Sequence, residues 1–368
     1  MSLRTNLKIF YYAYYSLIVF LLLLFPMQLQ KFYEPSQIGI IIGSITFFKF
    51  LSLTLFKKVE FTRKSLFYLN NIFILSMILI YIFQESFYLL LLFSVLFGVI
   101  NNFVISYFDQ ITIKTYRRYL GLFRVFGSFG GFFLFLAVIS FKSLVDDMSL
   151  LFYAYIFIYF ACSNMILYQR KRVLKLHAKI EDTKDIKNSS KDAMPYWIIG
   201  GFITIVMSFF HAFIGIYLKE FGYSTIDTSI LLCIGIFFEI IAFFIAHYLF
   251  KLHDYKTLFY VASLLTGFRL IFFDAFVNNF MILGITQAMH FFTFGLFYAS
   301  FMNILKNIYK SDINRALQIF NGYVDGVLKS IFIFIFAYLL YRGVFIILGL
   351  IIVIFCLFYF KEIFKKAN

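Results

Sequence analysis

Apolar segments long enough to cross a lipid bilayer recur along this whole chain, and they constrain its fold more than any other feature. Each is about 20 residues long, the length that a membrane-spanning helix needs. Twelve such segments can be drawn, at 8–29, 37–56, 65–83, 87–113, 119–141, 149–168, 195–218, 228–249, 257–273, 280–304, 316–340 and 343–361. Lipid offers no partner to backbone N–H and C=O groups, so this series predicts an all-α polytopic membrane protein with twelve transmembrane helices. A composition of 62% hydrophobic and 14% charged residues excludes an ordinary soluble domain.

The two sides of the chain repeat each other around one polar segment, residues 169–194. Short motifs return in the same order: KSLFY (64–68) as KTLFY (256–260), ITFFK (45–49) as IGIFFE (234–239), and FG (97–98) as FG (294–295). Parallel repeats of multi-helix halves are typical of transporters. We therefore predict two six-helix bundles at 1–168 and 195–368, joined by a cytoplasmic linker at 169–194.

The net charge of +15 reflects topology. If the N-terminus is cytoplasmic, most lysines and arginines fall on the cytoplasmic side, as the positive-inside rule requires. The opposite face then holds only Lys31, Lys142, Lys219 and Arg342. Both termini are thus predicted to be cytoplasmic, with anionic lipid head groups as neighbours. Nucleic-acid binding would need a basic groove in a soluble domain, and the sequence offers none.

Ionisable residues inside the predicted spans are costly, so they indicate a functional cavity. They are Lys49, Asp109, Arg124, His211, Glu239, Arg269, His290, Asp325 and Lys329. Most of them fall near the midplane, the depth of transporter substrate sites. Lys49 and Glu239 occupy matching positions in the two repeats, which suits one shared chamber. His211 is equally consistent with packing.

Asp109 and Arg124 lie near the facing ends of the fourth and fifth spans, where a charge pair can form. Asn102 shares the Asp109 face. This group is either a substrate contact or a structural clamp between two helices, and the residues alone leave both open.

The tenth and eleventh spans carry the remaining polar residues. Gln287, His290 and Thr293 fall on one face of the tenth span, a stripe that favours a functional role over simple packing. Asp325 and Lys329 are four residues apart in the eleventh span, so they form either a functional pair or a local neutralisation.

Nothing in the chain predicts an enzyme. No H-E-x-x-H, G-x-S-x-G or P-loop motif occurs. The three cysteines stand singly in apolar segments, without the spacing of a metal site or a disulfide framework. We expect no cofactor and no bound metal.

Several motifs together resemble the major facilitator superfamily, and within it the proton-coupled branch with lactose permease, nucleoside symporters and phenylpropionate permease-like proteins. They are QKFYEPSQIGIIIGSI at the first loop, Asp109 followed by GLFRVFGSFGGF, and FFEI, GFRL and AMHFFTFG in the second half. The resemblance implies that Asp109 and Arg124 hold substrate, and that Glu239, Arg269 and His290 manage the proton. Thr293 stands where lactose permease has a carboxylate, and a threonine cannot take up a proton, so the sequence departs here from the pattern on which sugar specificity and that particular proton relay rest.

These observations predict a monomeric secondary transporter of a bacterial cytoplasmic (inner) membrane, with Glu239 as the proton carrier. Lys49, Asn102, Asp109, Arg124 and Gln287 are its predicted substrate contacts. The midplane cations Lys49, Arg269 and Lys329 outnumber the anions Glu239 and Asp325, which favours symport of a small organic anion, conceivably aromatic. A sugar or nucleoside permease, an uncoupled facilitator or drug exporter, and a membrane sensor or scaffold are the alternatives.

Overall fold

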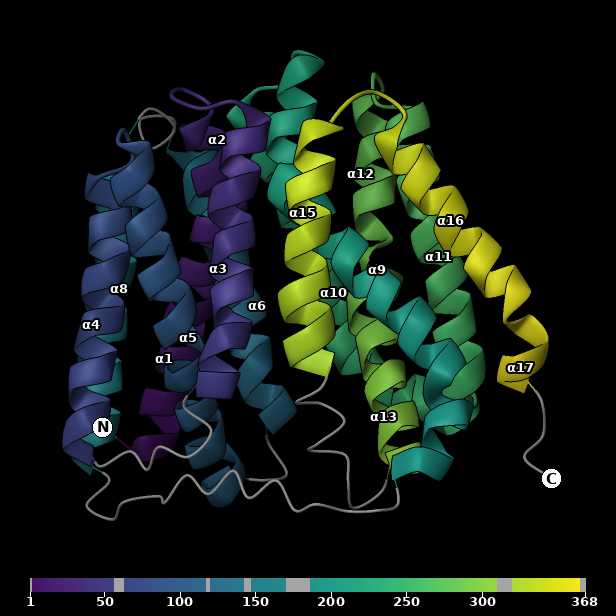
Figure 1. Cartoon of the computed structure of the whole chain (residues 1–368), viewed down its shortest axis with the longest axis horizontal. Helices are drawn as coiled ribbons and strands as arrows, with labels where there is room; N and C mark the ends of the chain where they lie inside the picture. Colours follow the sequence, from purple (N-terminus) through teal and green to yellow (C-terminus); the bar gives the residue numbers. More distant parts are fainter. Residues whose placement is uncertain are drawn as a thin grey trace. The chain divides into compact units, whose positions relative to one another are not determined.

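The apolar segments of the chain are helical, as their length and composition predict. The computed structural model describes residues 2–55, 63–116, 120–141, 147–169, 186–309 and 320–364. Within these ranges no residue lies in a β-strand, and each predicted span contains helix (Figure 1). A helix bonds its backbone N–H and C=O groups within its own segment, and this is the requirement that lipid imposes.

The helices before the predicted linker follow the expected spans. They are α1 (Leu3–Val19), η1 (Phe20–Leu24), α2 (Phe25–Leu29), α3 (Pro35–Leu55), α4 (Arg63–Ile82), α5 (Phe87–Tyr116), α6 (Leu120–Ser140) and α8 (Ser149–Gln169). η1 is a π-helical turn shortly before Pro26. Proline supplies no N–H to the helical ladder, so the regular α-helical bonding is interrupted in this stretch.

The helices after the linker also follow the expected spans, with one difference at the start. They are α9 (Ile186–Glu220), α10 (Thr225–Leu252), α11 (Tyr255–Ala275), α12 (Phe280–Ala288), η3 (Phe291–Leu296), α13 (Phe297–Tyr309), η5 (Phe320–Leu328), α15 (Lys329–Tyr338), α16 (Val344–Phe358) and α17 (Phe360–Phe364). α9 begins at Ile186 rather than at the predicted residue 195. A helix keeps its backbone bonds when it leaves the bilayer, so polar residues can extend it into water.

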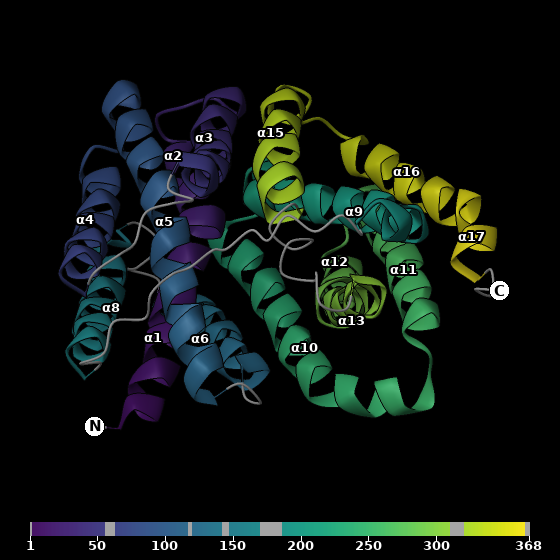
Figure 2. The same ribbon diagram turned by 60° about the horizontal axis from the view of Figure 1, so that its bottom comes forward.

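The helices group into two compact units. The first unit is Met1–Lys179 with Gly326–Tyr338, and the second is Ile180–Asp325 with Leu339–Asn368. In the first unit, α1 packs against α6 and α8, and α5 packs against α3 and α4 (Figure 2). In the second unit, α11 packs against α16, and α10 packs against α12 and η3.

Helix α15 belongs to the first unit through its contacts with α3. The hydroxyl groups of Thr46 and Ser330 are 2.7 Å apart. The ring of Phe334 lies against Gly43, where any larger residue would overlap it. The sequence analysis instead assigns this helix to the second predicted bundle, residues 195–368, and that domain division stays a prediction.

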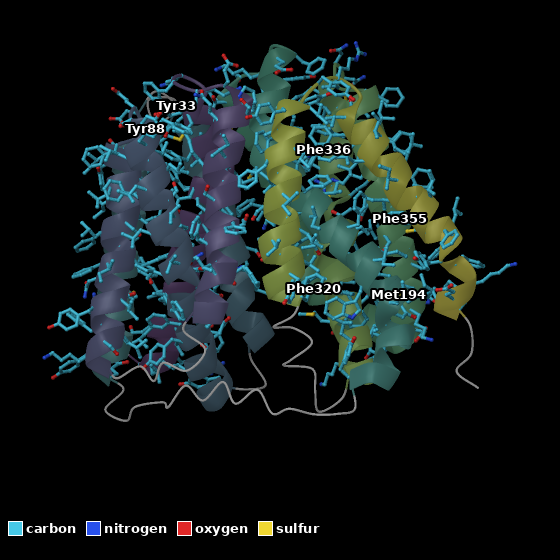
Figure 3. All side chains as sticks on the ribbon, viewed as in Figure 1. Tyr33, Tyr88, Met194, Phe320, Phe336 and Phe355 are labelled. Carbon is cyan, nitrogen blue, oxygen red and sulfur yellow. The ribbon has the colours of Figure 1, made fainter. Side chains whose placement is uncertain are left out.

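The length of the helices and the exposure of their apolar side chains are both those expected in a membrane. Among the described residues, eight helices are long and apolar enough to span a bilayer. Shorter apolar helices cover Pro35–Leu51, Val125–Ser140 and Val344–Phe358. Large apolar side chains are exposed, for example Tyr88 with 83% and Met194 with 55% of its surface (Figure 3). Apolar exposure on this scale is unfavourable in water and is expected where lipid tails cover the surface.

The repeated FG dipeptide lies where the corresponding pair of helices comes close in each unit, although the two glycines meet different positions of the neighbouring helix. A Cβ added at Gly98 on α5 would lie 2.5 Å from the carbonyl oxygen of Ile45 on α3. A Cβ added at Gly295 in η3 would overlap the Cβ of Ala242 on α10. The fourth span therefore approaches the second closely in each unit, as small residues allow between membrane helices.

Candidate functional site

Arg269 on α11 is the centre of a buried polar cluster in the second unit. Its side chain has no exposed surface. Nη2 donates to Oε1 of Gln287 at 2.8 Å, and Nη1 donates to Oγ1 of Thr293 at 2.7 Å. Nη1 also lies 2.9 Å from Nδ1 of His290. The guanidinium carbon is 5.1 Å from the centroid of the Phe210 ring, which adds a cation–π contact.

His290 joins Arg269 to Glu239 and is held in one tautomer by these two neighbours. A guanidinium can only donate, so Nδ1 of His290 must accept from Arg269. The imidazole proton of the neutral ring therefore sits on Nε2, which is 3.1 Å from Oε2 of Glu239. His290 and Glu239 are both buried. A continuous chain of polar contacts thus runs from a cation through an imidazole to a carboxylate.

Local helix geometry brings these side chains to one point. Gln287, His290 and Thr293 are three residues apart, on the segment where α12 ends and the π-helical turn η3 begins. Turns of this kind occur often at functional sites. Gly235 on α10 leaves room beside them, since a Cβ there would lie 3.5 Å from Oε1 of Gln287.

Two donors in this cluster have no acceptor within the described part of the chain. They are Nε of Arg269 and Nε2 of Gln287, both on fully buried side chains. A buried polar group without a partner is costly, and such groups are rare in native proteins. The cluster is therefore able to bind an additional acceptor, such as a carboxylate or a hydroxyl oxygen.

His211 on α9 lies beside this cluster. Its ring centroid is 5.0 Å from that of His290, and the two rings are nearly perpendicular at 82°. The sequence does not decide whether His211 has a packing role or a functional one, and the ring contact is compatible with both.

In the first unit, Asp109 on α5 accepts a hydrogen bond from a tyrosine. The Tyr11 hydroxyl donates to Oδ1 of Asp109 at 2.5 Å and lies 3.1 Å from the Thr112 hydroxyl. One turn along α1, the Tyr14 hydroxyl donates to Oδ1 of Asn101 at 2.7 Å. Sequence reasoning missed both tyrosines, although YYAYY at 11–15 places them three apart on one helical face.

The other predicted site residues are distributed over both units. Asn102 is buried on α5, and Lys49 is partly buried on α3. The side chain of Arg124 lies outside the described residues, so its pairing with Asp109 stays a prediction. Asp325 is in η5 of the second unit, and Lys329 is the first residue of α15 in the first unit. The shared chamber also stays a prediction.

Asp274 is a further buried acid, and its surroundings explain it structurally. It accepts from the Tyr217 hydroxyl at 2.6 Å and from the backbone N–H groups of Gly343 at 3.0 Å and Phe345 at 2.9 Å. These N–H groups form the start of α16, where a carboxylate satisfies unpaired donors. The bonds join α9, α11 and α16.

One family model covers most of the chain. Residues 4–327 match the family model of the MFS_1-like family. The chain belongs to this family. It is a multi-pass membrane transporter with the major facilitator fold, and it is not an enzyme. Among curated proteins, none matches the chain in sequence.

Solved structures of two transporters share this fold. The nucleoside transporter NupG has a TM-score of 0.73 and 12% identity, with 100% of both chains covered. A point mutant of the same transporter has a TM-score of 0.71 and 14% identity over 99% of this chain and 100% of that chain. The inward-open xylose transporter XylE from E. coli has a TM-score of 0.66 and 12% identity over 99% of this chain and 96% of that chain.

Proposed function

We propose that this chain is a proton symporter of a small organic anion. The chain of polar contacts Glu239–His290–Arg269 carries the proposal. A carboxylate that gains and loses a proton next to a fixed cation changes the charge of a buried site by one unit. Such a change is the physical basis of coupling, because it alters the affinity of the site for a second charge.

The charges of the cluster favour an anion as the second substrate. Arg269 is positive, and Glu239 balances it while Glu239 is ionised. Protonation of Glu239 leaves one buried positive charge, which is expensive without a counter-ion. A substrate carboxylate would supply that charge, and the unpaired donors on Arg269 and Gln287 would bind its oxygens.

A neutral solute is the second candidate. Transporters named for a nucleoside and for xylose share the fold over nearly the whole chain. Hydroxyl oxygens of a sugar or nucleoside could accept from the same two donors. Asn102, Asp109 and Lys49 in the first unit are further proposed contacts for either substrate.

The proposed location is the cytoplasmic membrane of a bacterium, with both termini in the cytoplasm. The lysine and arginine bias of the loops supports this orientation. The protein would act as a monomer, with the two helix bundles moving around a central site.

Replacing Glu239 by glutamine tests the coupling. Glutamine keeps the shape of the side chain but cannot carry the proton, so Glu239→Gln should abolish accumulation driven by a pH gradient. Counterflow exchange, which needs no net proton movement, should continue. The measurement is uptake of labelled substrate into proteoliposomes.

Glu220→Gln is the matched control, because Glu220 is an exposed carboxylate at the end of α9. It should leave accumulation unchanged. Normal accumulation by Glu239→Gln would refute the proposed role of Glu239.

Electrical measurement tests the charge of the substrate. One proton moving with a monovalent anion transfers no net charge, whereas one proton with a neutral solute does. Uptake of aromatic acids, sugars and nucleosides should be compared in proteoliposomes adsorbed to a capacitive electrode. We expect pH-driven anion uptake without current. An inward positive current with a neutral solute as the best substrate would establish the second candidate instead.

A further inference from the structure

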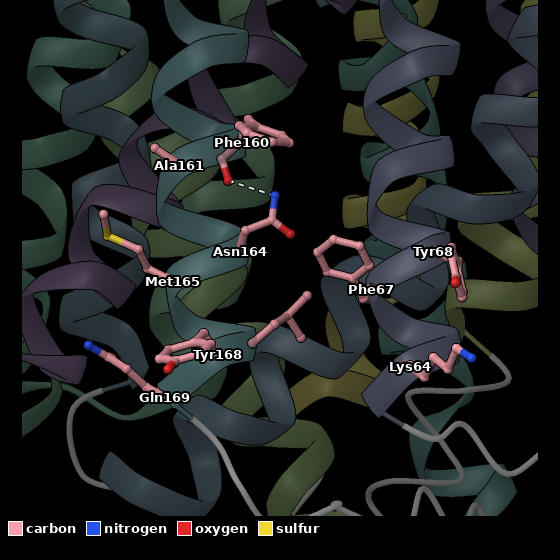
Figure 4. A pocket seen from close by; sticks show the side chains of 10 residues that line it. Lys64, Phe67, Tyr68, Phe160, Ala161, Asn164, Met165, Tyr168 and Gln169 are labelled. Atoms are coloured by element: carbon pink, nitrogen blue, oxygen red, sulfur yellow. Dashed lines mark hydrogen bonds between the residues drawn. The ribbon is translucent and has the colours of Figure 1, made fainter.

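A surface groove runs between the ends of α4 and α8 in the first unit (Figure 4). Its volume is about 770 Å³, within the range of small-ligand sites. The residues that matter for its chemistry are Lys64, Phe67, Phe160, Asn164, Met165 and Tyr168. Most of them are aromatic or apolar, and one is a cation at the mouth.

Side-chain hydrogen bonds join the two helices beyond the inner end of the groove. Nδ2 of Asn70 on α4 donates to the Ser163 hydroxyl on α8 at 3.0 Å. The Tyr159 hydroxyl donates to Oδ1 of Asn70 at 2.8 Å. Since these bonds fix α4 against α8, the groove is a preformed feature of the first unit.

The repeated KSLFY motif differs in exposure between the two units. Phe67 is 45% exposed, whereas Phe259, its counterpart in KTLFY, has no exposed surface. Tyr260, the counterpart of Tyr68, packs against α17, with ring centroids 5.2 Å from Phe360 and 5.5 Å from Phe364. In the second unit, a helix of the chain itself covers the corresponding side chain.

The polar groups of the groove require two kinds of partner. Lys64 is exposed beside it and can pair with an anion. The linker after Gln169, another lining residue, has a net positive charge in sequence and begins with Arg-Lys-Arg at 170–172. This charge makes the basic linker an unfavourable occupant.

Asn164 supplies the second requirement. Its Nδ2 donates to the Phe160 carbonyl at 3.0 Å, but its buried Oδ1 has no partner in the described part of the chain. Figure 4 shows this oxygen on the side of the groove, turned away from the Phe160 carbonyl and toward Phe67. Such an acceptor needs a donor, and acyl chains carry none.

We propose that this groove binds an anionic phospholipid with a hydroxylated head group, of the phosphatidylglycerol type. The phosphate pairs with Lys64, and a hydroxyl donates to Oδ1 of Asn164. An acyl chain covers the exposed rings of Phe67 and Phe160 and the side chain of Met165. The cationic mouth and the predicted cytoplasmic position of this end agree with the anionic inner leaflet.

Native mass spectrometry of the detergent-purified protein tests the proposal with three lipids of identical acyl chains. Phosphatidylglycerol carries charge and hydroxyls, phosphatidylmethanol carries charge only, and phosphatidylcholine has neither a net charge nor a donor. We expect affinity to fall in that order. Equal binding of all three lipids would overturn the proposal.

Single substitutions test whether the lipid binds in the groove. Lys64→Gln should weaken phosphatidylglycerol binding about fivefold, the value of one lysine near an anionic head group. Asn164→Val should remove the difference between phosphatidylglycerol and phosphatidylmethanol. Lys256→Gln is the matched control, because Lys256 is the repeat counterpart of Lys64, and it should change nothing.

Met165→Trp provides an independent variant that fills the groove and should block binding. Melting temperatures of all four variants check that they remain folded. If Lys64→Gln and Met165→Trp are folded and bind phosphatidylglycerol like the wild type, the lipid lies elsewhere or the linker occupies the groove. Either result overturns the proposal.

Discussion

The two units place different chemistry in their buried polar networks. In the first unit, tyrosine hydroxyls donate to Asp109, Asn101 and Asn70. In the second unit, Arg269 and His290 form a chain that ends at Glu239. In the first unit the carboxylate of this network, Asp109, is hydrogen-bonded to neutral tyrosine, whereas in the second unit a carboxylate, an imidazole and a guanidinium contact one another in series.

This difference lies on a scaffold that the two units share. Gly98 brings α5 close to α3, and Gly295 brings η3 close to α10, the corresponding pair in the second unit. Duplication has thus preserved the contact between helices while the side chains beside it diverged. Under the proposed function, the chain Glu239–His290–Arg269 of the second unit is the part that responds to protons, and the tyrosine hydrogen bonds of the first unit hold its helices together.

The largest expected effect on transport and stability comes from changing Arg269, the centre of the polar cluster in the second unit. Lysine keeps the charge of Arg269 but cannot donate to Gln287 and Thr293 in the planar fork that arginine provides. Arg269→Lys should therefore stop transport and lower the free energy of unfolding by about 1.5–3 kcal/mol for each charged hydrogen bond that is lost. Uptake assays and denaturant titration in mixed micelles measure both.

Arg342→Gln is the control for that variant, since Arg342 is exposed in a loop, and it should leave transport unchanged. Wild-type transport by Arg269→Lys would show that the hydrogen-bond geometry of the cluster is not required.

An intermediate effect is expected at the shared crossing. Gly98→Ala and Gly295→Ala should each lower stability by about 1–3 kcal/mol, because the added methyl group overlaps a neighbouring helix. Gly284→Ala is the control, since the nearest atom to its Cβ would be 3.8 Å away. A change at only one of the two crossings would mean that the units are less alike in packing than the FG repeat indicates.

The smallest effect on stability is expected for the hydrogen bond between Tyr11 and Asp109 in the first unit. Tyr11→Phe removes one hydrogen bond to Asp109 and should cost about 1 kcal/mol of stability. Substrate affinity should fall moderately, while proton-driven accumulation stays possible. Tyr88→Phe, at an exposed position, is the control. Loss of coupling in Tyr11→Phe would place proton handling in the first unit as well and remove the contrast between the networks.

Much of the site could be anticipated from the sequence, because charged residues are rare in membrane spans. Glu239, Arg269 and His290 were identifiable for this reason, and Gln287 and Thr293 by their spacing from His290. The two tyrosines were not, since a tyrosine in an apolar segment is as common in packing as in hydrogen bonding. The early start of α9 was also missed, because a polar helix outside the bilayer has no apolar signature.

Composition and the length of the apolar runs were sufficient to establish a helical membrane protein, since lipid leaves the backbone almost no alternative to a helix. The internal repeat could likewise be recognised in the amino-acid sequence. Only the folded structure decided which donor meets which acceptor. The tautomer of His290, the unpaired donors of Arg269 and Gln287, and the open groove beside Lys64 all depend on distances between helices. Spacing within one helix cannot specify those distances, because they are set by how side chains on several helices pack together.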